Sequence, residues 1–569
     1  MMNNLNFSFN TTISGLVIDT GKDYFVLKNL SGRFKIFTNV STQIIIRNFE
    51  KLDEQTEKSH LLSDSQINLI KIGSIVTGTV VVYPEKANKM VCIKLIILDD
   101  SKNDNLVFEN PNFWIEYVLK IQEFWKKHAI DKEYGGYFTN LSRNGEITQT
   151  DKHTYVISRI IYGFCTSFAL TGNLEFLELA KHGVNFQLKH SLRKKGEYIL
   201  WETHLNRDGS LHKSNPRFYN IFTQIYSLTG LISYYSVTHS KEIEEIIKKS
   251  IHTLNVLFKD NKFGGFFDSI DKSSLKPIKN LSDSKSFNST IDVAISTLLP
   301  FFESCPKTSP EILGMLREIV QLILSHFIDK RTGWIREVFK RNWKFSNPNM
   351  HNPYSTPDKN IGIVGSNTKT AWLLLRMYDL VEKDYRKVVF SSANTILSNM
   401  SKKGYDSFRW GWFDVILRES DEFVWHQNKC WWAQEEGILG NFLYYLLTKN
   451  NIYRQIVNES IFFYLEYFID KDYGGIFDTV DINGNAYNSS KANPLKGSYH
   501  EIEIAYYLYL YFSGLKNRPF KLYYKFKELP ISLNCCLLRS LIPTKKIKAV
   551  KKKKANNIVC IEYNFSKDQ

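Results

Sequence analysis

The chain has 569 residues, of which 43% are hydrophobic and 14% aromatic, and a formal net charge of +16. This composition can bury a large core, which excludes a disordered chain, and the length predicts a main domain with at least one appended module. Since no run of 18 apolar residues occurs and residues 1–10 lack the pattern of a secretion signal, we expect a soluble, cytoplasmic protein without a transmembrane segment.

Residues 1–104 have the pattern of a small all-β domain. Short β-type runs are separated by turn residues, and they occupy 13–18, 24–27, 33–37, 74–82 and 90–95. Runs of this length predict a small closed β-barrel that resembles an OB fold. Aromatic platforms for stacking bases are sparse in it, so a structural or docking role is favoured over nucleic-acid binding.

After a polar linker at 99–105, residues 105–516 change to a helical pattern. Apolar residues recur at helical spacing in 113–127, 155–170, 175–190 and 218–237. A loop that joins glycine to an aromatic residue recurs six times, at 134–138, 196–198, 263–267, 333–334, 410–413 and 473–477. The intervals hold two helices each, so we predict a mainly α domain of twelve helices closed as an (α/α)6 toroid, also called a six-hairpin barrel. The alternative interpretation is that these loops are ordinary turns between helices.

The segment 425–437 combines three tryptophans with two adjacent carboxylates and an amide. Indole faces stack on the apolar faces of a sugar ring, while amide and carboxylate groups bond its hydroxyls. The segment therefore suits a sugar pocket. A helix that merely buries Trp431 and Trp432 is the structural alternative.

Four segments together resemble the N-acylglucosamine 2-epimerase family, which includes cellobiose 2-epimerases and mannose isomerases. They are 155–159 with Arg159, 218–222 with Tyr219, 429–436 with the pattern K-x-W-W-x-Q-x-E, and 496–500 ending in Tyr-His. They stand in the family order, and the resemblance covers about 400 residues.

The resemblance implies proton transfer through an enediolate without metal or cofactor, on a free mono- or disaccharide. It makes His500 the catalytic acid/base and Arg159 the group that stabilises the enediolate oxygen. It assigns substrate contacts to Tyr219, Trp372, Lys429, Trp431, Trp432, Gln434 and Glu436.

Two departures bear on the reaction. Where family members have Gly-His-x-x-Glu before Trp-Leu-Leu, this chain has Ser366 and Lys369 in place of the histidine and the glutamate. Residues 288–292 stand where many members carry two more histidines. A serine does not hold a proton at neutral pH without its own base. One remaining base, His500, favours an aldose–ketose isomerase with reduced or altered activity over a 2-epimerase.

Other functions stay open at this stage. A carbohydrate-binding protein without catalysis is the main rival. Inverting glycoside hydrolases also use this toroid, with Glu436, Glu435 and Asp414 as candidate carboxylates, although no spacing pairs them. His351, in a polar loop, is a candidate substitute for the lost histidine, but a lone loop histidine is more often solvated. Residues 362–370 lack the spacing of a phosphate-binding loop, so no nucleotide cofactor is expected.

The last part of the chain, 517–569, carries much of the positive charge, with seven lysines between 545 and 554. We expect a basic, partly disordered segment that contacts anionic surfaces and has no specific nucleic-acid partner. The seven cysteines are scattered, without metal-binding spacing, which predicts reduced thiols and no metal site. A homodimer is compatible with this sequence.

Overall fold

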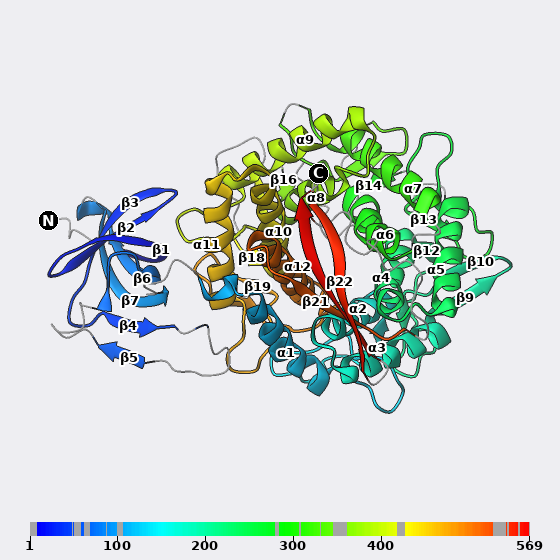
Figure 1. Cartoon of the computed structure of the whole chain (residues 1–569), viewed down its shortest axis with the longest axis horizontal. Helices are drawn as coiled ribbons and strands as arrows, with labels where there is room; N and C mark the ends of the chain where they lie inside the picture. Colours follow the sequence, from blue (N-terminus) through cyan, green and yellow to red (C-terminus); the bar gives the residue numbers. More distant parts are fainter. Residues whose placement is uncertain are drawn as a thin grey trace, which may run out of the picture.

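The computed structural model describes residues 8–47, 49, 58–61, 69–86, 88–99, 106–278, 284–305, 309–330, 332–344, 361–417, 427–526, 542, 545–555 and 558–567. Along these residues the chain forms a β-domain, a helical domain and a C-terminal sheet (Figure 1). His351 and Trp425 lie outside the described residues.

The helical domain is a double ring. The inner helices are α2 (Thr154–Thr171), α4 (Ile221–Thr238), α6 (Asp292–Ser304), α8 (Val364–Met377), α10 (Trp431–Thr448) and α12 (Tyr499–Leu515). Each inner helix packs against the next, and α12 packs against α2, which closes the ring (Figure 1). The outer helices are α1 (Pro111–His128), α3 (Leu174–Phe186), α5 (Lys241–Thr253), α7 (Ser309–Leu322), α9 (Lys383–Lys403) and α11 (Asn451–Tyr467). The prediction of a mainly helical toroid is confirmed.

The sequence explains which helices lie inside. Outer helix α5 carries lysines and glutamates on one face and isoleucines on the other. Inner helices are apolar almost all round: α4 has no acidic or basic residue, and α2 has only Arg159. Since a charge inside the ring is costly unless it is paired or used, the few charged residues of inner helices mark functional or structural sites.

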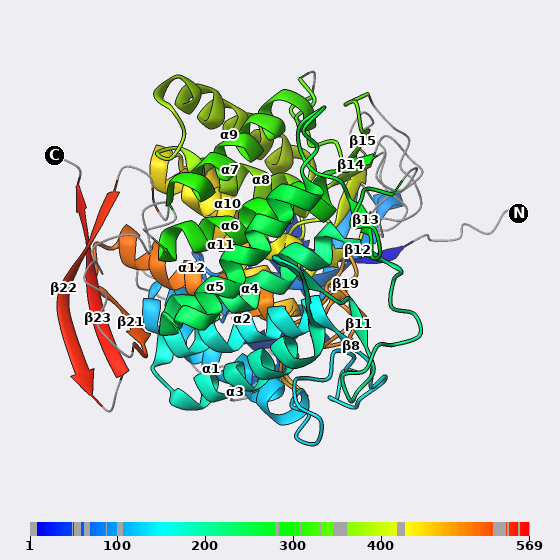
Figure 2. The ribbon, with the colours of Figure 1, turned by 90° about the vertical axis from the view of Figure 1, so that its right-hand side faces the viewer.

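All inner helices begin at the same end of the toroid, which we call the mouth (Figure 2). Short strands lead into five of them: β8 (Lys152–His153), β12 (Phe218–Asn220), β14 (Ser284–Ser286), β16 (Ile361–Ile363) and β18 (Lys429–Cys430). Their antiparallel partners are β11 (His204–Leu205), β13 (Ser269–Asp271), β15 (Val338–Lys340), β17 (Val415–Leu417) and β19 (Thr479–Val480). β19 also pairs with β20 (Ala486–Asn488), and β9 (Leu192–Lys195) pairs with β10 (Tyr198–Trp201).

Four of the glycine-aromatic loops contain a buried ion pair, which we call the hairpin lock. Its members are Lys152–Asp131 at 2.8 Å, Lys285–Asp260 at 2.9 Å, Lys429–Asp406 at 3.0 Å and Lys491–Asp470 at 2.9 Å. In each, the aspartate starts the turn and the lysine comes from a later segment of the chain. In the first lock, the Asp131 carboxylate accepts backbone N–H groups of the turn, and Gly135 and Gly136 have positive φ. Each ion pair thus connects a turn to the later segment that carries its lysine.

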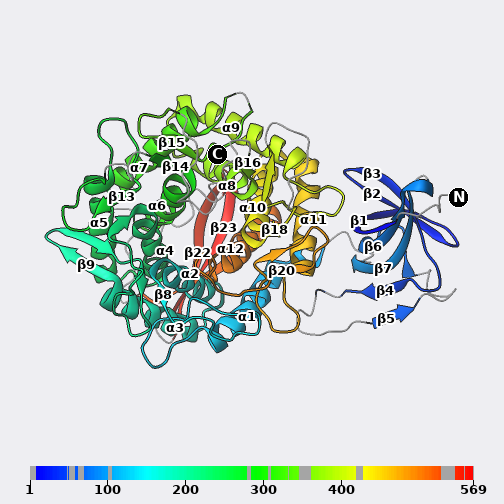
Figure 3. The ribbon, with the colours of Figure 1, turned by 180° about the vertical axis from the view of Figure 1, so that it is seen from behind.

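The N-terminal β-domain is a closed barrel. Its strands are β1 (Phe9–Thr20), β2 (Tyr24–Asn29), β3 (Gly32–Phe37), β6 (Ile75–Tyr83) and β7 (Lys89–Asp99). They pair in the order β1-β2-β3-β7-β6, and β6 returns to β1. β4 (Gln43–Ile46) and β5 (Lys58–Leu61) extend the sheet beside β7. Figure 3 shows the barrel beside α11.

Barrel and toroid share an interface. Ile45, Phe49 and Leu98 of the barrel belong to the core of the toroid, and the ring of Phe49 lies 6.0 Å from that of Phe462. Arg47 donates from Nε and Nη2 to the two carboxylate oxygens of Glu466, at 2.7 and 2.8 Å. The barrel therefore braces the outer face of α11.

We expect Arg47→Met to loosen this brace and to lower the free energy of unfolding by about 2 kcal/mol, because a bidentate charged pair at a largely buried interface is lost. The measurement is denaturant unfolding followed by tryptophan fluorescence. Arg33→Met, at an exposed position of the same barrel, is the matched control. Equal stability of the two variants would contradict the brace.

The C-terminal sheet covers the end of the toroid opposite the mouth (Figure 2). It consists of β21 (Phe520–Tyr524), β22 (Lys545–Ala555) and β23 (Ile558–Lys567), in the order β21-β23-β22. The expectation of a basic, partly disordered segment did not anticipate these strands. Leu522, Tyr524 and Ile561 are buried in this sheet, so it contributes to the core.

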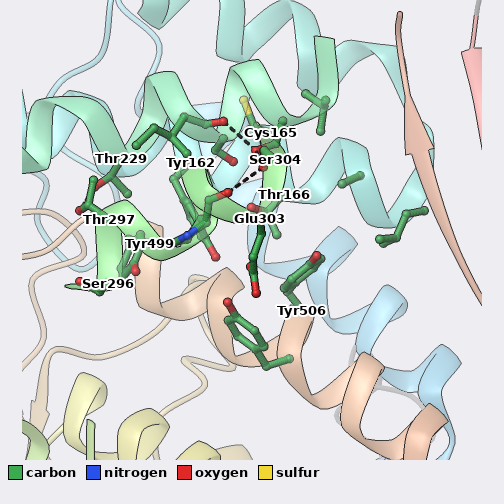
Figure 4. Close-up of a pocket in the computed structure, with 18 of the residues that line it drawn as sticks. Tyr162, Cys165, Thr166, Thr229, Ser296, Thr297, Glu303, Ser304, Tyr499 and Tyr506 are labelled. Carbon is green, nitrogen blue, oxygen red and sulfur yellow. Dashed lines mark hydrogen bonds between the residues drawn. The ribbon is translucent and has the colours of Figure 1, made fainter. Parts of the chain in front are cut away.

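β21 packs on α2, and its Leu522 and Tyr524 help to line a cavity of about 80 Å³ among the inner helices (Figure 4). The same cavity is lined by the buried ion pair of Arg376 and Glu303, at 3.1 Å. None of the helices in the described residues is long and apolar enough to cross a membrane.

Candidate active site

Charged side chains converge where the inner helices begin. His500 lies at the start of α12, Glu435 and Glu436 near the start of α10, Lys369 in the second turn of α8 and Asp292 at the start of α6. All five are at most 6% exposed. The toroid brings them together because every inner helix presents its first turns at the mouth.

His500 is held by a carboxylate and surrounded by aromatic rings. Its Nδ1 lies 2.5 Å from Oε2 of Glu435. The rings of Trp431 and Trp432 each lie 6.2 Å from the imidazole, and the ring of Tyr499 packs edge-on at 4.7 Å. A carboxylate on Nδ1 fixes the orientation of a histidine whose other nitrogen does chemistry.

The two departures from the family pattern face partners of their own. Lys369 Nζ lies 3.3 Å from Oδ2 of Asp292 and 3.6 Å from Oε1 of Glu436. Ser366 donates from Oγ to Oδ1 of Asn288 at 2.6 Å. Lys369 therefore adds a buried positive charge to the site, while the Ser366 hydroxyl donates to an amide oxygen.

Burial and mutual repulsion shift the titration of these groups. The pKa of Glu435 is raised well above its ordinary value by burial and by Glu503 and Glu436. Burial also raises the pKa of Glu436 well above its ordinary value, against the opposing effect of Lys369. Burial lowers the pKa of His500, and the charges of Lys369 and Arg159 add to this effect. Such opposed shifts in one cluster of side chains are typical of acid–base sites.

Arg159 lies on the neighbouring helix, as predicted. Its Nη1 donates to the carbonyl of Leu495, five residues before His500, and its guanidinium lies 4.1 Å from the centre of the Tyr226 ring. The contact with Leu495 ties α2 to the segment that leads into α12.

Buried polar atoms without a hydrogen-bond partner gather at this place. Within the described residues they include Arg159 Nε, Asn288 Nδ2, Asp292 Oδ1, Trp431 Nε1, both carboxylate oxygens of Glu436 and Oε2 of Glu503. Folded proteins satisfy nearly all buried polar atoms. A concentration of exceptions around one histidine is suited to a polar ligand with several hydroxyls.

Two residues assigned to substrate contact make structural contacts in this fold. Lys429 belongs to the hairpin lock, and its ammonium donates to Asp406 and to the carbonyl of Trp410. Gln434 holds a loop in place, because its side-chain amide accepts the N–H of Trp412 and donates to the carbonyl of the same residue. Gln224 makes the same two hydrogen bonds with Trp201 in another hairpin, so this arrangement recurs within the toroid.

Tyr219 and Trp372 also lie apart from the contacts of His500. Trp372 donates from Nε1 to the hydroxyl of Tyr511 and packs edge-on against Tyr507, within the core of α8 and α12. Tyr219 lies in β12 with Lys272 over its ring at 5.0 Å. In these contacts both residues support the walls of the toroid.

Sequence reasoning missed Glu503 and gave Glu435 no part in the histidine site. Glu503 lies one turn after His500, and its Oε1 accepts from the hydroxyl of Tyr499 at 2.8 Å. The available signal was the rarity of charge on inner helices, because Glu435 and Glu436 are the charged residues of α10. Acidic residues at such positions require a partner or a function.

The carboxylate geometry bears on the hydrolase alternative. Ligand atoms of Glu435, Glu436, Glu503 and His500 all lie within 4.8 Å of one another. Inverting hydrolases separate their two carboxyl groups by roughly 6.5–9.5 Å to admit a water. Asp414 instead accepts from the thiol of Cys430. Glu435 and Glu436 therefore lie too close together to act as the acid and base of an inverting hydrolase.

A model of the N-acylglucosamine 2-epimerase (GlcNAc 2-epimerase) family matches residues 136–503. The chain is 22% identical to a cellobiose 2-epimerase of Eubacterium cellulosolvens, over 69% of this chain and 96% of the relative. It is also 22% identical to a D-mannose isomerase of Marinomonas mediterranea, over 70% of this chain and 97% of that protein. The structure of a cellobiose 2-epimerase from Bacillus thermoamylovorans is similar, with a TM-score of 0.61 at 16% identity, covering 70% of this chain and 98% of the other.

Proposed function

Because the chain belongs to the N-acylglucosamine 2-epimerase family, we propose that it is a sugar isomerase that moves the proton next to the carbonyl of an open-chain sugar. The observation that carries this proposal is the pair of His500 and Glu435, buried among tryptophans and hydrogen-bond groups without partners. The substrate is a free mono- or disaccharide.

His500 acts as the base through Nε2. When Glu435 is ionised, Nδ1–H donates to its carboxylate and the lone pair of Nε2 is free to accept the proton at C2. The enediolate that forms carries negative charge on its oxygens. Arg159, Lys369 and the N-terminal ends of the inner helices supply positive charge for this oxygen. Trp431 and Trp432 offer apolar faces for the sugar.

The reaction we propose is a shift of the carbonyl between C1 and C2. Inverting C2 needs proton return from the opposite face, and in the described part of the chain the Ser366 hydroxyl donates to the amide of Asn288 and not to a base. Shifting the carbonyl needs one base on one face. His500 can take the proton from C2 and return it to C1, while the hydroxyl proton on O2 passes to O1, so that the carbonyl moves to C2 and an aldose becomes a ketose.

A carbohydrate-binding protein without turnover is the second candidate. The observation that favours it is the ammonium of Lys369, which lies between Asp292 and Glu436 where the family has a glutamate. In that case the site holds a sugar, but the proton at C2 stays in place.

Deuterium exchange separates the two candidates. We expect incubation of the protein in D₂O with mannose, glucose, fructose, N-acetylmannosamine or cellobiose to place deuterium on carbon for at least one sugar and to form its ketose or aldose partner. Proton NMR measures both. Binding of a sugar by calorimetry without any deuterium incorporation would instead establish the binding protein.

We also infer that the N-terminal barrel is OB-like. The order β1-β2-β3-β7-β6, with a parallel β3–β7 pair, supports a five-stranded Greek-key barrel. Its contacts with α11 favour a bracing role for it.

A further inference from the structure

A second group of chemically active side chains lies at the rim of the mouth, outside the site of His500. Asp151 and His153 flank Lys152 at the start of β8, and His204 opens the partner strand β11. His153 and His204 stand directly opposite each other in the antiparallel pair. Directly opposed residues point to the same face of a sheet, which brings the two rings together.

The three side chains share one small volume. Nε2 of His204 is hydrogen-bonded to Oδ2 of Asp151, and Nε2 of His153 lies 3.7 Å from the same oxygen. The two imidazole rings are stacked at 4.3 Å. One ligand atom from each residue fits within 4.8 Å of the others. A tetrahedral ion with bonds of about 2.0–2.1 Å separates its ligands by about 3.3 Å, so the two stacked imidazoles must rotate about their side-chain bonds to turn their nitrogens toward one ion.

The backbone around the group is fixed by hydrogen bonds. Thr139 donates from Oγ1 to the carbonyl of Asp151 and accepts the N–H of His153. Asn215 accepts the N–H of His204 at 3.0 Å. A site whose backbone is held in this way loses little conformational entropy when it binds an ion.

We propose that Asp151, His153 and His204 bind a divalent transition-metal ion, for which Zn²⁺ is the best match. Two imidazoles and one carboxylate are the donor set of open zinc sites, whereas Mg²⁺ and Ca²⁺ prefer oxygen ligands. The proton held between His204 and Asp151 passes to solvent when the ion takes its place.

The site has room for further ligands. Its side chains are 13–17% exposed, and Asp151 borders an open cavity of about 590 Å³ together with Arg207 and His212. The ring of His212 lies 4.0 Å from that of His204. Its Nδ1 accepts the N–H of Ser214, so we do not count it among the three ligands. Water or a substrate hydroxyl can reach the remaining coordination positions from this cavity.

An ordinary hydrogen-bonded pair does not explain this arrangement. One imidazole satisfies the carboxylate of Asp151, but a second imidazole, that of His153, is stacked on the His204 ring, and the His212 ring contacts it at a tilt. The group around His500 is less suited to a metal, because the ammonium of Lys369 already lies 3.6 Å from Glu436. The proposal does not depend on the sugar reaction.

The test is titration of the full chain, stripped of metal, with Co²⁺ and Zn²⁺. We expect one equivalent to bind, with visible absorption bands from Co²⁺ and a rise of the unfolding temperature with Zn²⁺. His204→Ala removes a direct ligand and should weaken binding by about 100-fold, and the milder Asp151→Asn, which keeps an oxygen but loses its charge, should weaken it by about 10-fold or more. His252→Ala, which removes an exposed histidine elsewhere, is the matched control.

Three results would overturn the proposal. One is a wild-type chain that binds less than half an equivalent of either ion. Another is unchanged binding by both ligand variants when circular dichroism shows them folded. The third is loss of binding in Glu435→Gln together with full binding in His204→Ala, which would place the ion at His500.

Discussion

Replacing His500 with alanine should lower the rate of deuterium exchange at the sugar carbon by at least about 10³-fold, near the upper range for loss of a general base. His500 is the histidine of the described residues that contacts Glu435 and both tryptophans of the mouth. Within the described residues the Ser366 hydroxyl donates to Asn288, so it does not provide a second base. Proton NMR in D₂O measures the rate for wild type and variant with the best sugar of the panel.

The control for this experiment is His252→Ala, whose exposed side chain lies on the outer helix α5, 3.9 Å from Glu197. Sugar binding by calorimetry should persist in His500→Ala, since Trp431 and Trp432 remain. Full exchange in His500→Ala would show that another group is the base. Loss of both exchange and binding would instead assign His500 to ground-state recognition.

The hydrogen-bonded pair of His500 and Glu435 also sets the pH dependence of exchange. The base form requires an ionised Glu435, whose pKa is raised above the ordinary 4.5 by burial and by Glu503. Exchange should therefore be present above this raised pKa and be lost as the pH falls through it, with a midpoint above 4.5. Glu435→Gln should remove that acidic limb and slow exchange, because the amide cannot stabilise the imidazolium.

The helical architecture could be predicted because its signals are local. Glycine-aromatic turns at even intervals and the apolar sequences of α2 and α4 are readable one segment at a time. The C-terminal sheet was missed for the opposite reason. Its strand β21 pairs with β23 across more than thirty residues, and the lysines of β22 have the composition of a solvated tail.

The site could be predicted in part. A motif identifies which residues recur but not which way each side chain points, so Lys429 and Gln434 were grouped with Trp431 although their contacts are structural. The positions of Ser366 and Lys369 were recognised as departures. Their partners Asn288 and Asp292 come from the neighbouring hairpin, and that pairing depends on how α6 packs against α8.

Lys429→Met should lower the free energy of unfolding by about 3 kcal/mol, the lower part of the range for breaking a buried ion pair. Its ammonium is fully buried and donates to Asp406, and it lies 4.5 Å from the centre of the Phe463 ring. Methionine keeps most of the volume but leaves the Asp406 carboxylate at 5% exposure with Arg409 as its remaining ion-pair partner, at 3.5 Å. Denaturant unfolding followed by tryptophan fluorescence measures the change.

The comparison with sugar binding decides what Lys429 does. If it belongs to the hairpin lock, Lys429→Met loses stability while the folded protein keeps its sugar affinity within about twofold, because no substrate contact is removed. Lys402→Met makes the same substitution at an exposed position of α9 and should change neither quantity. A variant that keeps its stability but binds sugar at least tenfold more weakly would show that Lys429 contacts the substrate. A tenfold loss of affinity corresponds to about 1.4 kcal/mol of binding free energy. Lys152→Met, at the equivalent position of another lock, should reproduce the loss of stability, since the same buried pair with Asp131 is broken there.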